Sequence, residues 1–500
     1  MEIVVSVFKE LMSFDTLFIT LLGALLGVVF GAIPGLNGSI CIAILLPTTY
    51  GLSAVHSLLL LGSIYMGSSY GGSISGILIN VPGSSEATCT AMEGYPMSRK
   101  GRGKEALYYA ILASVFGGLC GVAVLIFFTP LLASVALQFG PPEMFLIAVA
   151  GLAVVGSLSG KGIGKGFFAV LFGVLLSMIG VDTLTGQSRL TFGIPQLTSG
   201  IGLIPAIVGF FALSEMVCQC AKIGEKGSKT VSLEKIRLVE AIRRLFKHWF
   251  LLIKSTLIGI WIGILPGTGG AISAFVSYGE AKRGYKEGEV PFGEGNEKGI
   301  IAAESSNNAA VGGSLIPLLA LGIPGSATAA IIYGAILIHG ITPGPKLFID
   351  APELAYSFTI GMLFAVLAMG VIGICGVPLF SKILKIKIQY IVPIVIVCSL
   401  IGAYSSRNSI YDVVIAVVCG LIGVLFHRCG IPVAPVMLGL ILGNLVEVNL
   451  RNSMLIAAAK DVNLLQYIFT RPLSIAVVVL LALMLFGNIK TSLRSKNTEE

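Results

Sequence analysis

The sequence has little charge for its length. Of 500 residues, 33 are Lys or Arg and 25 are Asp or Glu, so 12% are charged, whereas soluble domains carry about a quarter. Hydrophobic residues make up 55% of the chain, and the mean hydropathy is +0.94. A soluble globule could not cover this much apolar side chain with polar surface, so we expect an integral membrane protein.

Several chemical signatures are also missing. The 9 cysteines form no C-x-x-C pair, and the 4 histidines are isolated, so neither a disulfide framework nor a metal site is indicated. No G-x-x-x-x-G-K-[ST] phosphate loop occurs. Basic residues lie in short loops between apolar segments, which is typical of cytoplasmic loops and excludes nucleic acid as a partner. We therefore expect no enzyme and no resident cofactor.

Glycine and proline, by contrast, are abundant, at 63 and 21 residues. Apolar segments long enough to approach the roughly 20 residues of a spanning helix recur along the whole chain, and many contain Gly or Pro. We expect an all-α polytopic membrane protein with about 10 to 13 crossings and re-entrant pieces. The predicted division is a first transmembrane repeat (1–220), a basic cytoplasmic linker or interfacial helix (221–248), a second repeat (249–490) and a cytoplasmic tail (491–500).

The two halves repeat their Gly and Pro positions. Residues 27–38 match residues 259–270 at an offset of 232, and all identities are Gly or Pro. Gly71-Gly72-Ser73 recurs as Gly312-Gly313-Ser314, and Pro82-Gly83-Ser84 recurs as Pro324-Gly325-Ser326. This order indicates a duplicated half.

Charge predicts how the halves are oriented. The loop after the first Pro-Gly-Ser carries Arg99, Lys100, Arg102 and Lys104, whereas the loop at 340–353 carries only Lys346 as a basic residue. The positive-inside rule puts the first loop in the cytoplasm and the second outside, so we predict repeats of inverted topology. Continuing the same count puts Arg407 and Arg451 outside.

Pro-Gly and Gly-Gly breaks within apolar segments leave backbone groups that hydrocarbon cannot satisfy. Breaks in matched positions predict a binding site at the membrane midplane, where half-helix N-termini favour anions and freed carbonyls can hold a cation. The alternative for Gly23, Gly27 and Gly31 is close helix packing. The predicted substrate-binding residues are Pro34, Gly35, Asn37, Gly38, Ser39, Ser73, Ser75, Ser84, Ser85, Pro266, Gly267, Thr268, Gly269, Asn307, Asn308, Ser314, Gly325, Ser326 and Thr328.

Glu304 is the ionisable residue most worth following, because no basic residue occurs between Lys298 and Lys346. A carboxylate within the membrane is a functional hypothesis by default, here a cation or proton site; the alternative is a helix end at the interface. The predicted coupling-ion residues are Glu304, Gly35, Gly267 and Ser305. Glu86 and Glu93, which lie near the basic loop, are expected to form salt bridges there.

A set of motifs resembles one known family. The motifs are Gly31-Ala-Ile-Pro-Gly35, Tyr70-Gly-Gly-Ser-Ile-Ser75, Asn80-Val-Pro-Gly83, Glu93-Gly-Tyr-Pro-Met97, Leu265-Pro-Gly267, Glu304 to Asn308, and Gly322-Ile-Pro-Gly-Ser-Ala-Thr328. Together they resemble the large membrane subunit of the tripartite tricarboxylate transporters. The first corner departs from the family at Asn37-Gly38, where a small or apolar residue is common, and this leaves substrate identity open.

The resemblance implies a secondary transporter in a bacterial or archaeal inner membrane. It would act with a small four-helix membrane subunit and an extracytoplasmic solute-binding protein. Its substrates would be citrate or other carboxylates, carried with sodium or protons, and sodium would be present only as a transported ion. Two other classes remain open from the residues alone: a membrane-embedded enzyme acting on a lipid-linked or intramembrane substrate, and a passive channel.

Overall fold

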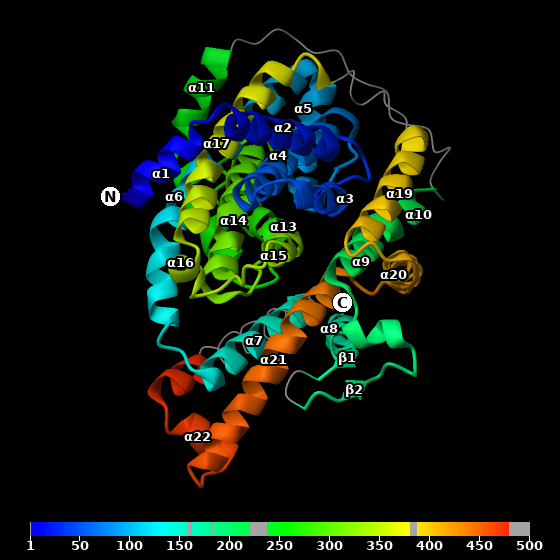
Figure 1. Cartoon of the computed structure of the whole chain (residues 1–500). Helices are drawn as coiled ribbons and strands as arrows, with labels where there is room; N and C mark the ends of the chain where they lie inside the picture. The colour runs from blue at the N-terminus through cyan, green and yellow to red at the C-terminus, as the bar shows by residue number, and fades with distance from the viewer. Residues whose placement is uncertain (1, 159–162, 183–184, 221–237, 381–387, 480–500) are drawn as a thin grey trace.

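The computed structural model describes residues 2–158, 163–182, 185–220, 238–380 and 388–479, and these are almost entirely helical (Figure 1). The predicted tail and parts of the predicted linker and second repeat lie outside the described residues. The helices are α1 (Glu2–Leu11), α2 (Phe14–Ala32), α3 (Gly38–Leu45), α4 (Ala54–Ile79), α5 (Ala87–Met97), α6 (Gly103–Ala136), α7 (Pro141–Leu158), α8 (Ile163–Ser177), α9 (Leu203–Ile207), α10 (Ser214–Cys220), α11 (Leu238–Lys247), α12 (Trp249–Ile264), α13 (Gly269–Arg283), α14 (Glu297–Leu321), α15 (Ala327–Ile338), α16 (Leu347–Asp350), α17 (Pro352–Gly376), α19 (Ile388–Ser405), α20 (Ile410–Cys429), α21 (Ala434–Ala459) and α22 (Leu464–Phe469). The described strands, β1 (Gly180–Val181) and β2 (Ser188–Arg189), form one antiparallel hairpin.

The expectation of an all-α polytopic membrane protein is confirmed. Among the described residues, 6 helical segments are long and apolar enough to cross a membrane, or 7 if α11 and α12, which meet at a bend of 78°, form one span. Five further apolar helices have 10–17 residues. Length and composition do not decide which of these shorter helices cross the membrane, so the total of about 10 to 13 crossings stays a prediction.

Helices α4 and α14 are the most buried long helices. Nearly every residue of both is shielded from the surface, although α4 is rich in Ser and Gly and α14 carries Glu and Asn. Residues that do not face lipid need not be apolar, so the Ser, Asn and Glu side chains can be held inside the bundle. The polar chemistry of the chain is thus concentrated on its two central helices.

Glycines let the neighbouring helices approach α4 and α14 closely. A Cβ on Gly27 of α2 would lie 2.4 Å from the backbone oxygen of Ile64 on α4. A Cβ on Gly259 of α12 would lie 2.2 Å from the backbone oxygen of Ser306 on α14. No side chain fits at either point, so the packing interpretation of this glycine stripe is confirmed.

The same contacts give the register of the repeat. A Cβ on Gly31 would lie 3.0 Å from the Cα of Gly71, and one on Gly263 would lie 3.1 Å from the Cα of Gly313. Gly71 therefore corresponds to Gly313, and the sequence match of Gly71 with Gly312 is wrong by one residue. Position in the seam, not identity of three small residues, decides the equivalence. The offset becomes 242 for both α4 and the following Pro-Gly-Ser.

The Pro-Gly-Ser turns confirm this offset. The Gly83 N–H donates to Gly72 O at 3.0 Å, and the Gly325 N–H donates to Ser314 O at 3.2 Å. Backbone architecture is thus repeated in the two halves. Their opposite orientation in the membrane stays a prediction.

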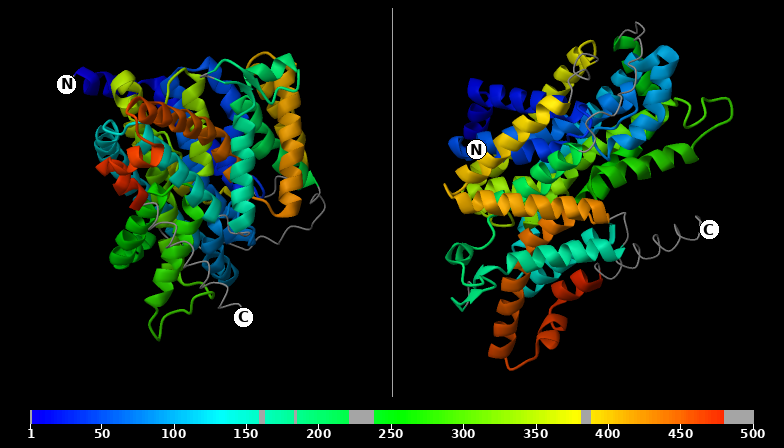
Figure 2. Two further views of the ribbon diagram at one scale, coloured as in Figure 1. Left: turned by 90° about the horizontal axis from the view of Figure 1, so that it is seen from below. Right: turned by 90° about the vertical axis from the view of Figure 1, so that its right-hand side faces the viewer.

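Three groups of helices meet around α3, α13 and α15 (Figures 1 and 2). The largest contains α2, α4, α6, α12, α14 and α17, which pack on one another. A second group contains α9, α10, α19 and α20, and a third contains α7, α8 and α21. Because first-half and second-half helices interleave in every group, the boundaries predicted from sequence do not separate packing units.

The two arginines predicted to lie outside both take part in ion pairs, and Arg451 does so beside the β1–β2 hairpin. Arg451 pairs with Asp182 at 2.7 Å, and Arg189 of β2 pairs with Glu447 at 2.6 Å. Arg407 pairs with Asp412 at 2.6 Å, and its guanidinium lies beside Gly202. Each of these arginines therefore has a carboxylate partner.

Candidate functional site

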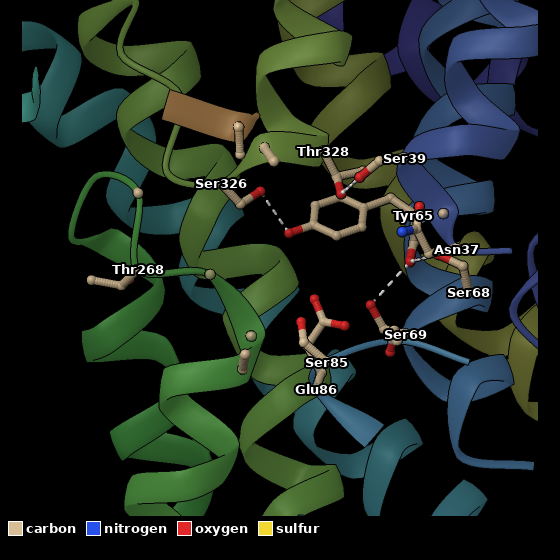
Figure 3. Close-up of a pocket in the computed structure, with 18 of the residues that line it drawn as sticks. Asn37, Ser39, Tyr65, Ser68, Ser69, Ser85, Glu86, Thr268, Ser326 and Thr328 are labelled. Atoms are coloured by element: carbon tan, nitrogen blue, oxygen red, sulfur yellow. Dashed lines mark hydrogen bonds between the residues drawn. The ribbon is translucent and has the colours of Figure 1, made fainter. Parts of the chain in front are cut away.

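A cavity of about 370 Å³ lies where the three groups of helices meet (Figure 3). Its walls come from the start of α3, the middle of α4, the turn before α5, and the starts of α13, α15 and α21. Phe211, between α9 and α10, completes it. We call this the central cavity.

The central cavity is surrounded by helix N-termini. Asn37 caps α3 by accepting the Ile40 N–H at 3.0 Å, and Ser326 caps α15 by accepting the Ala329 N–H at 3.1 Å. Glu86 precedes α5, Gly269 begins α13, and Pro435 lies in the first turn of α21. All five starts contribute lining residues. Helix N-termini carry free N–H groups and partial positive charge, so this arrangement favours an anion.

Many of the sequence-predicted residues come together here. Those that line the central cavity are Asn37, Gly38, Ser39, Ser84, Ser85, Gly267, Thr268, Gly269, Ser326 and Thr328. Their polar atoms offer both donors and acceptors, as a carboxylate and an accompanying cation would require.

The Pro-Gly corners shape the backbone that carries these residues. Gly35 and Gly267 have φ of +83° and +75°, a region that favours glycine. The Gly267 N–H donates to Gly325 O at 2.9 Å, which ties the second corner to the turn before α15. Pro34, Gly35, Pro266 and Gly325 do not line the central cavity among its described walls. Their contribution is to end α2 and α12 and to turn the chain.

Hydrogen bonds across the central cavity join the halves. The Tyr65 hydroxyl contacts Ser326 Oγ at 2.8 Å and Ser314 Oγ at 3.1 Å. Ser39 Oγ lies 2.7 Å from Thr328 Oγ1. Figure 3 shows the Tyr65–Ser326 and Ser39–Thr328 contacts. First-half and second-half polar groups are therefore parts of one site.

Other predicted residues face helix seams instead. Ser75 donates to Gly72 O, Ser305 donates to Ala302 O, and Asn308 Nδ2 donates to Met66 O. Asn307 Nδ2 donates to Ser69 O at 3.0 Å, behind the cavity wall. These side chains lie on faces of α4 and α14 that pack against other helices, which a list of small polar residues cannot distinguish from a cavity face.

Glu304 is at the centre of a separate polar cluster. It is fully buried, which excludes the interpretation as a helix end at the interface. Ser73 and Thr90 donate to its Oε1, and Ser114 donates to its Oε2 at 2.8 Å. Four helices, α4, α5, α6 and α14, thus supply the cluster, which we call the Glu304 cluster.

The salt bridges expected for Glu86 and Glu93 are wrong. Glu93 is buried and accepts backbone N–H groups from Gly293, Gly295 and Asn296 at 2.6, 2.9 and 2.8 Å. Glu86 lines the central cavity and takes part in no ion pair within the described chain. Nearness in sequence to the basic loop therefore did not predict the contacts of either carboxylate, because Glu86 faces the central cavity and Glu93 faces the loop before α14.

Sequence reasoning missed several lining residues. These are Tyr65, Ser68, Ser69, Phe211, Pro432, Ala434, Pro435 and Leu438. Ser68 and Ser69 lie directly before the Tyr70-Gly71-Gly72-Ser73 motif in α4, and this was a usable signal. The contribution of α21 had no counterpart in the repeat and could not have been found that way.

Comparison with known proteins identifies the family. The model of the tripartite tricarboxylate transporter TctA family matches residues 17–438. A relative in Agrobacterium vitis, described as an uncharacterized 52.8 kDa protein in the TAR-I ttuC' 3'region, is 38% identical over 439 residues, covering 87% of this chain and 86% of the relative. A second, described as an uncharacterized protein in the TAR-II ttuC' 3'region of the same organism, is 34% identical over 199 residues, covering 40% of this chain and 82% of the relative. No solved structure matches.

The family match covers every residue described as lining the central cavity and all four residues of the Glu304 cluster. It describes a transporter family and not an enzyme family, so the enzyme interpretation is set aside. The chain belongs to the tripartite tricarboxylate transporter TctA family and is a multi-pass membrane transport protein.

Proposed function

We propose that this chain is the large transmembrane subunit of a binding-protein-dependent secondary transporter. It imports tricarboxylates such as citrate, or related small carboxylates, by symport with sodium or protons. The observation that carries this proposal is the central cavity, where five helix N-termini and a ring of hydroxyls converge. Its volume of about 370 Å³ falls in the range of small-molecule sites.

The cavity has donors suited to carboxylate oxygens. Ser84 lines the cavity, and its Oγ, which is buried beside Gly72, has no hydrogen-bond partner in the described part of the chain, so we propose that this hydroxyl turns toward a bound ligand. The N–H groups at the very start of α3, α13 and α15 add to it. In α5 the Ala87 and Thr88 N–H groups are bonded to Ser84 O and Ser85 O, so this helix contributes mainly the partial positive charge of its N-terminus. A small organic anion can thus be held without any lysine or arginine, and none is present among the described lining residues.

The Glu304 cluster supports a site for the coupling ion. Its carboxylate and three hydroxyl groups are oxygen ligands, which a dehydrated alkali cation prefers, and a buried carboxylate needs a compensating charge. Ser73, Thr90 and Ser114 replace Ser305 in this proposal, because the Ser305 hydroxyl is directed to Ala302 O. The corner carbonyls of Gly35 and Gly267 lie on loops and not in this cluster.

The two sites share an element. Thr90 of the Glu304 cluster is one helical turn after Glu86, so α5 touches both. Ion binding that positions α5 would change the central cavity and so favour substrate binding. Access would then alternate as the group containing α21 and the group containing Phe211 move against the body around α4 and α14.

The remaining parts of the proposal concern the assembly. We propose that the chain acts in a bacterial or archaeal inner membrane with a small four-helix membrane subunit and an extracytoplasmic solute-binding protein. Lipid-facing helices such as α12 and α20 expose large apolar side chains, which suits contact with lipid or with a membrane subunit.

Uptake into proteoliposomes tests the proposal. The complex purified from its native membrane through a tag on this chain is reconstituted, and labelled citrate is added with and without the solute-binding protein. We expect accumulation that needs the binding protein and a sodium or proton gradient, each imposed separately. A voltage-driven current without coupling would indicate a channel. Accumulation without the binding protein would contradict the tripartite assembly.

Substitution Glu304→Gln tests the coupling site. The substitution keeps the size of the side chain but removes its negative charge. The affinity for the coupling cation, and with it gradient-driven uptake, should fall by roughly tenfold or more, the change that one pK unit of lost charge interaction produces. Thr90→Val should weaken the sodium dependence in the same direction. Ser399→Ala removes a buried hydroxyl elsewhere, in α19, and is the matched control. Unchanged coupling in Glu304→Gln that is inserted normally would refute this site.

A further inference from the structure

The central cavity contains a charge that opposes its expected ligand. Its N-termini and hydroxyls favour an anion, yet Glu86 is the single charged side chain among the described residues that line it. Figure 3 shows the Glu86 side chain directed into the cavity from the turn before α5. A carboxylate substrate in about 370 Å³ must therefore share the space with a protein carboxylate.

Glu86 is not neutralised by the protein. Glu86 takes part in no ion pair within the described chain, although the basic residues at 99–104 follow soon after, between α5 and α6. Its Cγ lies 2.8 Å from where a Cβ of Gly270 would be, so the absence of a side chain at Gly270 makes room for it. The side chain is half-buried, between the first turns of α5 and α13.

The groups around Glu86 are polar but carry no positive charge. From α4 it faces Tyr65, whose hydroxyl already contacts Ser326 and Ser314. From α14 the nearest titratable group is Glu304, and a Cβ on Gly270 would meet Asn307 Oδ1 at 2.3 Å. The described lining residues on α3, α13, α15 and α21 are uncharged. A substrate carboxylate that binds beside the Glu86 carboxylate is repelled by it unless a positive charge lies between the two.

We propose that Glu86 is a coupling residue of the central cavity: it makes carboxylate binding depend on one positive charge, delivered as a proton or an alkali cation. With Glu86 ionised and alone, the cavity excludes anions and accepts a small cation beside its hydroxyls. When a positive charge is bound, it offsets the charge of Glu86, and the partial positive charge of the five helix N-termini then attracts the substrate carboxylate. This inference rests on the proposed function and adds a charge site distinct from the Glu304 cluster.

The experiment compares Glu86→Gln with the wild type in the tagged complex from native membranes. Binding of labelled citrate is measured while sodium is varied at fixed pH and pH is varied at fixed sodium. We expect the Kd of the wild type for citrate to rise about tenfold or more when the required cation is withdrawn. In Glu86→Gln the Kd should change less than about twofold. Which variable loses its effect identifies the cation as sodium or a proton.

Two further variants keep the test decisive. Glu86→Asp retains the carboxylate and should retain cation dependence, which covers the case in which Glu86→Gln does not assemble. Glu287→Gln removes the same charge from an exposed loop and should leave both dependences unchanged. If Glu86→Gln keeps the wild-type dependence on both cations, the inference is overturned while carboxylate transport stands. If the wild-type complex binds no carboxylate under any condition, the proposed function itself fails.

Discussion

The two halves of the molecule share a backbone but differ in their chemistry. Both place a glycine stripe against a central helix, and both return through a Gly N–H that bonds to that helix. At equivalent positions, however, Gly62 of α4 corresponds to Glu304 of α14, and Glu86 corresponds to Thr328. Each half therefore contributes one carboxylate, at a position where the other half has none.

The hydrogen bonds differ in the same way. Tyr65 of α4 contacts Ser326, whereas its counterpart Asn307 bonds to Ser69 O and leaves Ser84, the counterpart of Ser326, without a partner. The second-half turn is thus tied by a side-chain hydrogen bond to the central helix of the other half, whereas Ser84 of the first-half turn makes no such bond in the described chain. The two halves thus share the geometry that brings helix ends together, and they differ in the polar side chains that this geometry presents.

Replacing the seam glycines by alanine tests the shared backbone and should have the largest effect. Gly27→Ala puts a Cβ 2.4 Å from a backbone oxygen of α4, and Gly259→Ala puts one 2.2 Å from a backbone oxygen of α14. In each case the helices must move apart. We expect each to destabilise the protein by about 1–3 kcal/mol or more, to a similar extent in both halves. Thermal melting of the detergent-solubilised complex, followed by size exclusion, measures this.

Gly279→Ala is the control, because a Cβ there meets nothing within 4 Å and the residue is inside α13. It should be neutral or stabilising by up to about 1 kcal/mol. A much larger loss for one seam glycine than for the other would mean that the halves do not share the same packing.

Tyr65→Phe tests the difference in hydrogen bonding and should have an intermediate effect. It removes the hydroxyl that joins α4 to Ser326 and Ser314 while keeping the ring. We expect a loss of about 0.5–1.5 kcal/mol in stability and weaker citrate binding. Asn307→Ala, at the equivalent position, should change stability but affect binding less, because its amide lies behind the cavity wall. Equal effects on binding would contradict the assigned asymmetry.

The sequence predicted the repeated backbone well because that backbone depends on glycine and proline. Their positions are constrained by close approach at Gly27 and Gly259 and by positive φ at Gly35 and Gly267, and such constraints survive as identities. Helix ends at these breaks then placed Asn37 and Thr328 correctly beside a cavity.

Side-chain direction was not predictable in the same way. Ser73 and Ser69 both lie on the Gly-rich part of α4, but Ser69 lines the central cavity and Ser73 bonds to Glu304. The difference depends on which helix packs on each face, and a single sequence does not show it. The walls from Phe211 and α21 were missed for a related reason, since their approach is tertiary and leaves no local pattern.

The pair Ser39 and Thr328 provides the smallest test of the comparison. Their hydroxyls are 2.7 Å apart and join α3 of the first half to α15 of the second. The equivalent positions are Ala271 and Glu86, where alanine offers no hydroxyl. A double-mutant cycle with Ser39→Ala and Thr328→Val should give a coupling of about 0.5–1.5 kcal/mol in the same thermal measurement.

A substitution at the equivalent position of the second half, Ala271→Ser, extends the comparison. Ala271→Ser should offer Glu86 a donor that the wild type lacks, which stabilises the ionised carboxylate. Citrate binding by Ala271→Ser should then require a sodium or proton concentration that is a few fold higher. Ser39→Ala, by contrast, should weaken citrate binding and leave the cation requirement unchanged. This opposite behaviour follows because Glu86 carries the charge and Thr328 does not. If both substitutions shifted the cation requirement equally, the two halves would act as one electrostatic unit, and the division of roles between Glu86 and Thr328 would be wrong.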